Sequence, residues 1–216
     1  PMVYKHISLI FSWAMRAFMF ASSIYYVYKE DIFGAIIIAL ALGFALIPEI
    51  FRLVYNVRLH WIYDILFTLL ITGHMVGFMG MYEQSLIYDD FLHIIGAFIL
   101  GIFGFMMIYS YDYSEKIKIT LPFLMFFTIL WTIGIGAIWE ITEFLWDNIA
   151  TFSSEFGFAQ DSLLDTMIDL SWDFICGVLA TLLMAVIFRR MGKETKESLV
   201  KPIANVLIGK NEGAKV

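Results

Sequence analysis

The segments WEITEFLWD (Trp139–Asp147) and DTMIDLSWD (Asp165–Asp173) decide how this chain is interpreted. They place six acidic side chains within or beside long apolar runs, at Glu140, Glu143, Asp147, Asp165, Asp169 and Asp173. A lone carboxylate is costly to bury in hydrocarbon, so such groups are normally paired, protonated or coordinated. Whatever fold the chain adopts must compensate these charges.

The composition is that of a membrane protein. Of the 216 residues, 61% are hydrophobic, and the mean hydropathy is +0.80, whereas soluble domains contain about 45 to 50% apolar residues. Apolar runs long enough to cross about 30 Å of hydrocarbon recur along the chain. They are continuous and lack the alternation of membrane strands, which favours helices over a barrel. The predicted fold class is therefore all-α, a polytopic helix bundle in a membrane.

The hydropathy pattern predicts about six transmembrane helices. Their expected bounds are Ile7–Tyr28, Ile32–Ile47, Trp61–Tyr82, Phe91–Tyr111, Ile119–Trp146 and Leu164–Phe188. Together they form one transmembrane domain, residues 1–190. A C-terminal tail, residues 191–216, either forms an amphipathic helix on the cytoplasmic surface or is loosely ordered.

The basic residues predict the orientation of the helices. With six spans and both termini in the cytoplasm, twelve of the fourteen Lys and Arg residues fall on the cytoplasmic side, and only Lys29 and Arg16 do not. This agrees with the excess of positive charge in cytoplasmic loops. The acidic residues then meet near the extracytoplasmic leaflet.

Their spacing predicts a metal site. Glu140 and Glu143 share one face of a helix, as do Asp165 and Asp169, because residues three or four apart lie on the same side. His93 and either Asp89 or Asp90 have the same relation in the fourth span. Two facing acidic stripes repel each other unless a cation lies between them, and bundles build metal sites in this way. The predicted ligands of a divalent metal ion are His93, Glu140, Glu143, Asp165 and Asp169.

Close packing would help to bring these residues together. Small residues follow His93 along the same helix, at Gly96, Ala97, Gly101 and Gly104, and such stripes let membrane helices approach closely. The alternative is a structural network in which the acids bond to Ser, Thr and Trp side chains, with Asp89, Asp90 and Asp147 solvated or capping helices. Arg16 and Asp64, in the inner halves of their spans, can form a structural ion pair.

Other site classes lack their sequence signatures. The chain has no glycine-rich phosphate loop, no G-x-S-x-G and no H-E-x-x-H. Its single cysteine, Cys176, excludes an internal disulfide. The basic residues of the tail are interspersed with acids, which gives little support to nucleic-acid binding.

Three motifs resemble a known family. They are YDDFLHIIG (Tyr88–Gly96), WEITEF (Trp139–Phe144) with Asp147, and Gln160 followed by DTMIDL (Asp165–Leu170) with Gly177. In this order they resemble the YjdF-like family of uncharacterised polytopic membrane proteins. The first motif alone is similar to VanZ-like proteins, which are linked to glycopeptide resistance. Asp173 stands where the YjdF-like pattern has Asn, so its role stays open. The YjdF-like proteins are bacterial and archaeal, so the resemblance implies a multi-pass protein of a prokaryotic plasma membrane. It also implies the fold and the site, but no reaction.

Three functions remain open at this point. The leading hypothesis is metal-assisted hydrolysis or transfer on a lipid-linked substrate, with Glu140 or His93 as general base. The second is proton or cation transport through the intramembrane acids. The third is an accessory subunit, in which the acids form a structural network and the aromatic surface binds membrane-protein partners or a second copy. Membrane lipids are the surroundings expected in all three cases.

Overall fold

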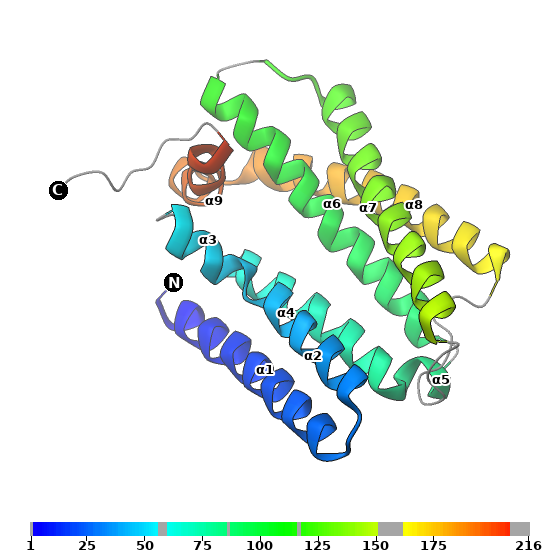
Figure 1. Cartoon of the computed structure of the whole chain (residues 1–216). Coiled ribbons are helices and arrows are strands. Elements are labelled where there is room, and N and C mark those ends of the chain that lie inside the picture. The colour runs from blue at the N-terminus through cyan, green and yellow to red at the C-terminus, as the bar shows by residue number, and fades with distance from the viewer. Residues whose placement is uncertain (1, 56–59, 86, 116–117, 151–161, 208–216) are drawn as a thin grey trace. The chain divides into compact units, whose positions relative to one another are not determined.

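The computed structural model describes residues 2–55, 60–85, 87–115, 118–150 and 162–207. Residues 151–161, which connect the two acidic segments and include Gln160, lie outside the described residues. The described residues contain helices and no strand, which confirms the all-α fold class (Figure 1). In chain order the elements are α1 (Met2–Tyr28), α2 (Ile32–Ala45), α3 (Ile47–Tyr55), α4 (Trp61–Val76), η1 (Gly77–Met81), α5 (Tyr82–Gln84), α6 (Tyr88–Glu115), α7 (Leu121–Ala150), α8 (Leu163–Arg190) and α9 (Lys193–Leu207).

Five helical segments are long and apolar enough to cross a membrane. They are α1, α4 with η1, α6, α7 and α8. The pair α2 and α3 makes a sixth candidate only if its two helices, bent by 49°, form one broken span. The structure therefore supports a membrane protein with five or six spanning helices.

The second predicted span differs from the structure, and the sequence around Pro48 explains why. The Asp31 side chain caps the start of α2 by accepting a hydrogen bond from the Gly34 N–H at 2.9 Å. The helix ends at Ala45, since Pro48 has no N–H to continue the backbone ladder. At about 1.5 Å per residue, α2 reaches about 21 Å, less than the hydrocarbon thickness of about 30 Å. Only α2 and α3 together are long enough to cross.

The third predicted span also has an irregular end. After Val76 the helix widens into the π-type turn η1, in which Gly80 has a φ of 115°. This value lies in the left-handed region that favours glycine. The turn ends the regular α4 and leads into the short helix α5, before α6 begins.

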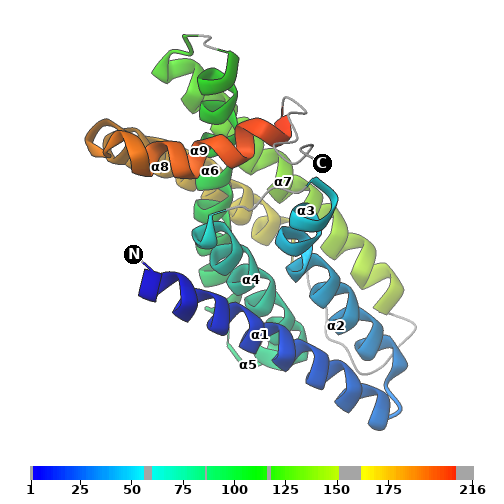
Figure 2. The ribbon, with the colours of Figure 1, turned by 90° about the vertical axis from the view of Figure 1, so that its left-hand side faces the viewer.

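The chain divides into two compact units. The first contains the residues up to Val76 and those from Asn205 onward, and the second runs from Gly77 to Ala204. In the first unit, α1 packs on α2 and α4 (Figure 2). In the second, α6, α7 and α8 pack against one another in all three pairs. The predicted acidic site belongs to this three-helix group.

Small residues let α6, α7 and α8 approach one another closely. A Cβ atom on Gly101 of α6 would lie 2.6 Å from the Cβ of Ala180 on α8. One on Gly104 would lie 2.6 Å from the Trp131 ring on α7, and one on Gly177 would lie 3.2 Å from the Cα of Ile129. Two members of the small-residue stripe predicted after His93, Gly101 and Gly104, are thus confirmed as packing positions.

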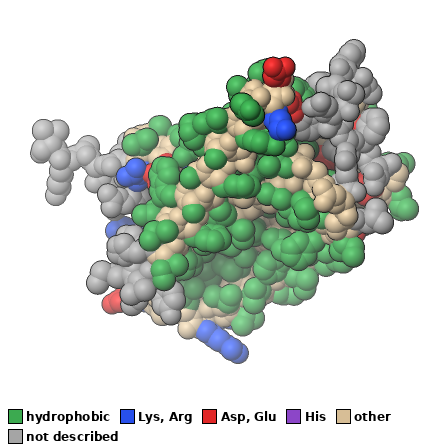
Figure 3. Space-filling model, turned by 90° about the horizontal axis from the view of Figure 1, so that it is seen from below, with side chains coloured by type: hydrophobic (Ala, Val, Ile, Leu, Met, Phe, Trp, Pro, Cys, Tyr) green, Lys and Arg blue, Asp and Glu red, His purple; other side chains and the backbone are tan. Residues whose placement is uncertain are grey.

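Apolar side chains cover the outside of the described helices. On α7, for example, Phe126, Leu130 and Ile138 each expose more than half of their surface. The face of the molecule in Figure 3 is mostly hydrophobic, with charged side chains near its margins. Such a surface suits lipid rather than water. The integral membrane class follows from it.

Helix α9 occupies much of the predicted tail. Leu199, Val200 and Ala204 are buried, whereas Lys193, Glu194 and Lys201 are exposed. The Lys196 ammonium lies 5.9 Å from the centre of the Phe188 ring at the end of α8. Of the two forms expected for the tail, the described part is helical, and three of its apolar residues, Leu199, Val200 and Ala204, are buried.

Candidate metal centre

The acidic and histidine side chains gather where α6 begins, in the second half of α7 and at the start of α8. Residues three or four apart lie on the same side of a helix. In each of these helices the side that carries the acids faces the neighbouring helices. Asp169 is 1% exposed, Glu143 2%, Asp173 3%, Glu140 5% and His93 6%. Acidic side chains are almost never buried to this degree unless they are paired. This concentration of buried acids is the most unusual feature of the molecule.

The donor atoms form two groups that share His93. One group contains Asp89, His93 and Asp169, and the other contains His93, Glu140 and Glu143. Within each group the candidate ligand atoms lie within 4.8 Å of one another. Donors on opposite sides of a Mg²⁺ or Ca²⁺ ion are separated by about 4 to 5 Å, since each bond is about 2.0 to 2.6 Å long. Both groups have the dimensions of a cation site.

His93 faces a carboxylate with each of its ring nitrogens. Nε2 lies 3.8 Å from Oδ1 of Asp89, and Nδ1 lies 3.7 Å from Oδ1 of Asp169. The sequence allowed either Asp89 or Asp90 beside His93, and the structure selects Asp89 and leaves Asp90 exposed. A neutral imidazole can ligate a metal through one nitrogen while the other N–H is oriented by a carboxylate.

Asp169 is the least exposed acid of the cluster. Neither of its carboxylate oxygens accepts a hydrogen bond from the described residues. A buried polar group without such a partner costs free energy, and an ionised one costs more. Nδ1 of His93 lies 3.7 Å from its Oδ1, which is too far for a hydrogen bond. The two oxygens of Asp169 are therefore available to bind a cation that lies between Asp169 and His93.

Aromatic side chains support the cluster on one side. The Trp139 Nε1–H donates a hydrogen bond to Oε1 of Glu143 at 2.8 Å. The Trp139 ring lies 6.3 Å from that of Phe78, and the rings of Tyr82 and Tyr88 lie 5.8 Å apart. The indole therefore orients Glu143 and leaves its other oxygen available.

Asp173 extends the buried acids one turn along α8. A Cβ atom at position 136 would lie only 1.7 Å from its Oδ2, so this carboxylate occupies space that the glycine of α7 leaves. Oδ2 accepts no hydrogen bond from the described residues. The predicted ligand set omitted Asp173. Its spacing of four residues from Asp169 was visible in the sequence, but the gap over Gly136 was not.

Four of the five predicted ligands come together, and one does not join them. His93, Glu140, Glu143 and Asp169 are all members of the two donor groups. Asp165 is half-buried one turn before Asp169 and belongs to neither group. Asp147, further along α7, is likewise half-buried and outside both groups.

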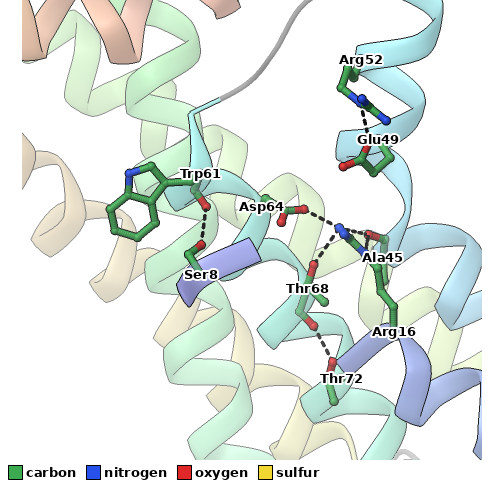
Figure 4. A network of polar contacts seen from close by, with 9 residues as sticks. All are labelled: Ser8, Arg16, Ala45, Glu49, Arg52, Trp61, Asp64, Thr68 and Thr72. Carbon is green, nitrogen blue, oxygen red and sulfur yellow. Dashed lines mark hydrogen bonds and ion pairs between the residues drawn. The ribbon is translucent and has the colours of Figure 1, made fainter. Parts of the chain in front are cut away.

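A second buried polar cluster ties the helices of the first unit together. Arg16 of α1 donates two hydrogen bonds to the Ala45 carbonyl, at 2.9 and 3.1 Å, and forms an ion pair with Asp64 of α4. The same guanidinium donates to Thr68 at 3.2 Å (Figure 4). The Arg16 and Asp64 pair considered from the sequence is thus confirmed. It also satisfies a carbonyl at the point where α2 breaks.

Comparison with known proteins supports a membrane-protein family without assigning it a reaction. A protein of Thermotoga maritima described as uncharacterized is 28% identical over 101 residues, which are 47% of this chain and 49% of that protein. The chain thus spans about half the length of this relative. No solved structure matches. The names YjdF-like and VanZ-like stay predictions. A family model described as "Predicted membrane protein (DUF2238)" matches residues 11–190, and the chain therefore belongs to this family.

Proposed function

We propose that the protein binds at least one divalent cation between α6, α7 and α8, in one or both of the donor groups. His93, Glu140, Glu143 and Asp169 are the proposed ligands, joined by Asp89. The observation that carries the proposal is Asp169, which is 1% exposed and accepts no hydrogen bond from the described residues at either oxygen. A cation would compensate a charge that is otherwise costly to bury. Asp165, half-buried on the same face, would add negative charge from outside the ligand shell.

The donor set narrows the choice of ion. Carboxylate oxygens are the preferred ligands of Mg²⁺, Ca²⁺ and Mn²⁺. A histidine among them also admits Zn²⁺ or Fe²⁺. Soft ions are disfavoured, because the only cysteine, Cys176, donates from its thiol to the Ile94 carbonyl at 3.5 Å and belongs to neither group.

The function that this site supports best is hydrolysis or group transfer on a lipid-linked substrate. An ion held here would polarise a phosphoryl or carbonyl oxygen of the substrate. His93 and Glu140 are both candidates for the general base, since whichever of them is not a ligand lies beside the reacting group. The charge pattern of the loops supports a site at the extracytoplasmic leaflet. The resemblance to YjdF-like proteins supports a prokaryotic plasma membrane.

The α7 and α8 interface favours a local site over a transmembrane path. One turn beyond Asp173, Thr132 lies against Gly177, and its hydroxyl donates to the Ile129 carbonyl of its own helix at 2.9 Å. The next buried hydroxyls, of Thr128 and Thr181, likewise donate to carbonyls of their own helices, at 2.8 and 2.9 Å. Beyond them the buried side chains include the apolar Leu124 and Met184. A proton or cation path would need polar groups there. Transport is therefore the second candidate, and an accessory subunit the third.

Elemental analysis of the purified protein tests the cation site. We expect at least one equivalent of a divalent metal in the unaltered protein and a lower content in both Glu140→Gln and Asp169→Asn. Glu194→Gln, an exposed position on α9, is the matched control and should keep the full content. A metal-free protein that elutes as a folded species would contradict the proposal.

A flux assay separates catalysis from transport. Proteoliposomes containing the unaltered protein should pass neither protons nor divalent ions. A flux that is abolished by Asp169→Asn but kept by Glu194→Gln would instead favour transport. A membrane protein that copurifies with the unaltered protein, but not with the variants that lose the metal, would favour the accessory-subunit function.

A further inference from the structure

The cluster is built as two carboxylate pairs rather than one ring of ligands. Asp89 and Asp169 form one pair, Glu140 and Glu143 the other, and His93 lies within ligand distance of both. Among the described residues, the ligand atoms of all four carboxylates do not lie within 4.8 Å of one another as a single group. A single ion cannot bind all four carboxylates directly in this arrangement, because opposite ligands of one ion are about 4 to 5 Å apart.

We infer that the site takes two divalent cations, one at each carboxylate pair, and that together they bind the phosphate group of a substrate. This inference rests on the proposed cation site and specifies how it is filled. His93 would ligate one ion through one nitrogen, since a neutral imidazole has a single free lone pair. The other ion completes its shell with carboxylate oxygens and water.

The charge of the cluster supports two ions. Asp89, Asp169, Glu140 and Glu143 carry four negative charges when ionised, and a single divalent ion would leave two of them without compensation. Two ions neutralise all four. In a low-dielectric site an uncompensated charge is too costly to leave in place.

The proposed ions would supply the positive charge that a phosphate group needs at this site. In the described part of the second unit, the basic residues are Lys193, Lys196 and Lys201 on α9, Lys118 just before α7, and Arg189 and Arg190 at the end of α8. The cluster lies toward the opposite ends of α7 and α8. A phosphate group that enters the site would therefore find positive charge on the two metal ions rather than on Lys or Arg side chains. Two metal ions about 3.5 to 4 Å apart commonly bind phosphoryl oxygens in enzymes.

Manganese titration followed by electron paramagnetic resonance tests the number of ions. The unaltered protein should bind two Mn²⁺ and show the broadened signal of a magnetically coupled pair. Asp89→Asn should bind one Mn²⁺ with an uncoupled six-line signal. Asp90→Asn is the matched control, because Asp90 is the exposed neighbour in the same first turn of α6, and it should keep both ions.

The outcomes separate this inference from the proposed function. One tightly bound, uncoupled Mn²⁺ in the unaltered protein would overturn the two-ion inference and leave the cation site standing. No bound Mn²⁺ in folded protein would overturn both. Loss of an ion in Asp90→Asn as well as in Asp89→Asn would show a general effect of charge and would overturn the assignment of ions to pairs.

Phosphorus resonance with the Mn²⁺-loaded protein tests the ligand class. Inorganic phosphate and a short-chain phosphatidic acid are the two probes. Broadening of both lines, relative to protein without Mn²⁺, supports a phosphate site open to water, and broadening of the lipid line alone supports one reached from the membrane. If neither line broadens, phosphate is not the ligand class.

Discussion

At the scale of single residues, the contact between Asp173 and Gly136 is the most demanding in the bundle. A methyl group at position 136 would meet Oδ2 of Asp173 at 1.7 Å. We expect Gly136→Ala to lower the free energy of unfolding by about 1 to 3 kcal/mol, as for other overpacked cores. The measurement is thermal unfolding in detergent. Gly134→Ala is the matched control, since nothing lies within 4 Å of that position, and it should be close to neutral.

A double-mutant cycle shows whether this cost comes from the carboxylate. In an Asp173→Ala background the added methyl group has room, so Gly136→Ala should lose most of its effect there. Residues in contact are not additive, and the difference between the two backgrounds measures their coupling. Equal destabilisation in both backgrounds would place the cause elsewhere on α7.

Trp139 offers a second test at the residue scale. Its indole N–H holds Glu143 at 2.8 Å, and groups that orient metal ligands typically contribute 10-fold to 100-fold in affinity. We expect Trp139→Phe to weaken metal binding by about this factor, measured by titration calorimetry. Trp131→Phe is the control, because the Trp131 Nε1 has no hydrogen-bond partner among the described residues. Equal affinities in the two variants would contradict an orienting role.

At the scale of the helices, Arg16 holds α1, α2 and α4 together. Removing one partner of a buried ion pair leaves the other uncompensated, which costs about 3 to 5 kcal/mol. We expect Arg16→Met to destabilise the protein by this order, and Arg16→Met with Asp64→Leu to recover much of the loss. Arg52→Gln, which removes the more exposed pair with Glu49, should cost about 0 to 1 kcal/mol. Thermal unfolding in detergent compares all three variants, and a double variant no more stable than Arg16→Met would contradict the pairing.

At the scale of the whole molecule, the broken pair α2 and α3 decides the topology. If it crosses the membrane, Lys29 and Ser85 lie on the same side, with Lys118 on the other; if it does not, Lys29 and Ser85 lie on opposite sides. We expect an impermeant maleimide to label Lys29→Cys and Ser85→Cys on intact cells, and Lys118→Cys only after permeabilisation. The native Cys176 is buried and gives little background. Labelling of only one of the first two positions on intact cells would show that the pair does not cross.

Much of the fold was predictable because hydropathy and helical periodicity are local properties. Continuous apolar runs indicated membrane helices, and the i, i+3 and i, i+4 spacings placed Glu140 with Glu143 and Asp165 with Asp169 on single faces. The break after Ala45 was missed although Pro48 was visible. Hydropathy alone does not reveal a bend when the residues before and after the bend are equally apolar.

The sequence by itself determined the membrane class, the helical architecture and the acidic faces of α7 and α8. Only the tertiary structure decided which acids meet. It selected Asp89 over Asp90 beside His93, left Asp165 outside both donor groups, and seated Asp173 over Gly136. The physical reason is that these contacts depend on the register between helices. Register is set by how small residues such as Gly101, Gly136 and Gly177 let neighbouring helices approach, and the periodicity of one helix contains no information about its position against another.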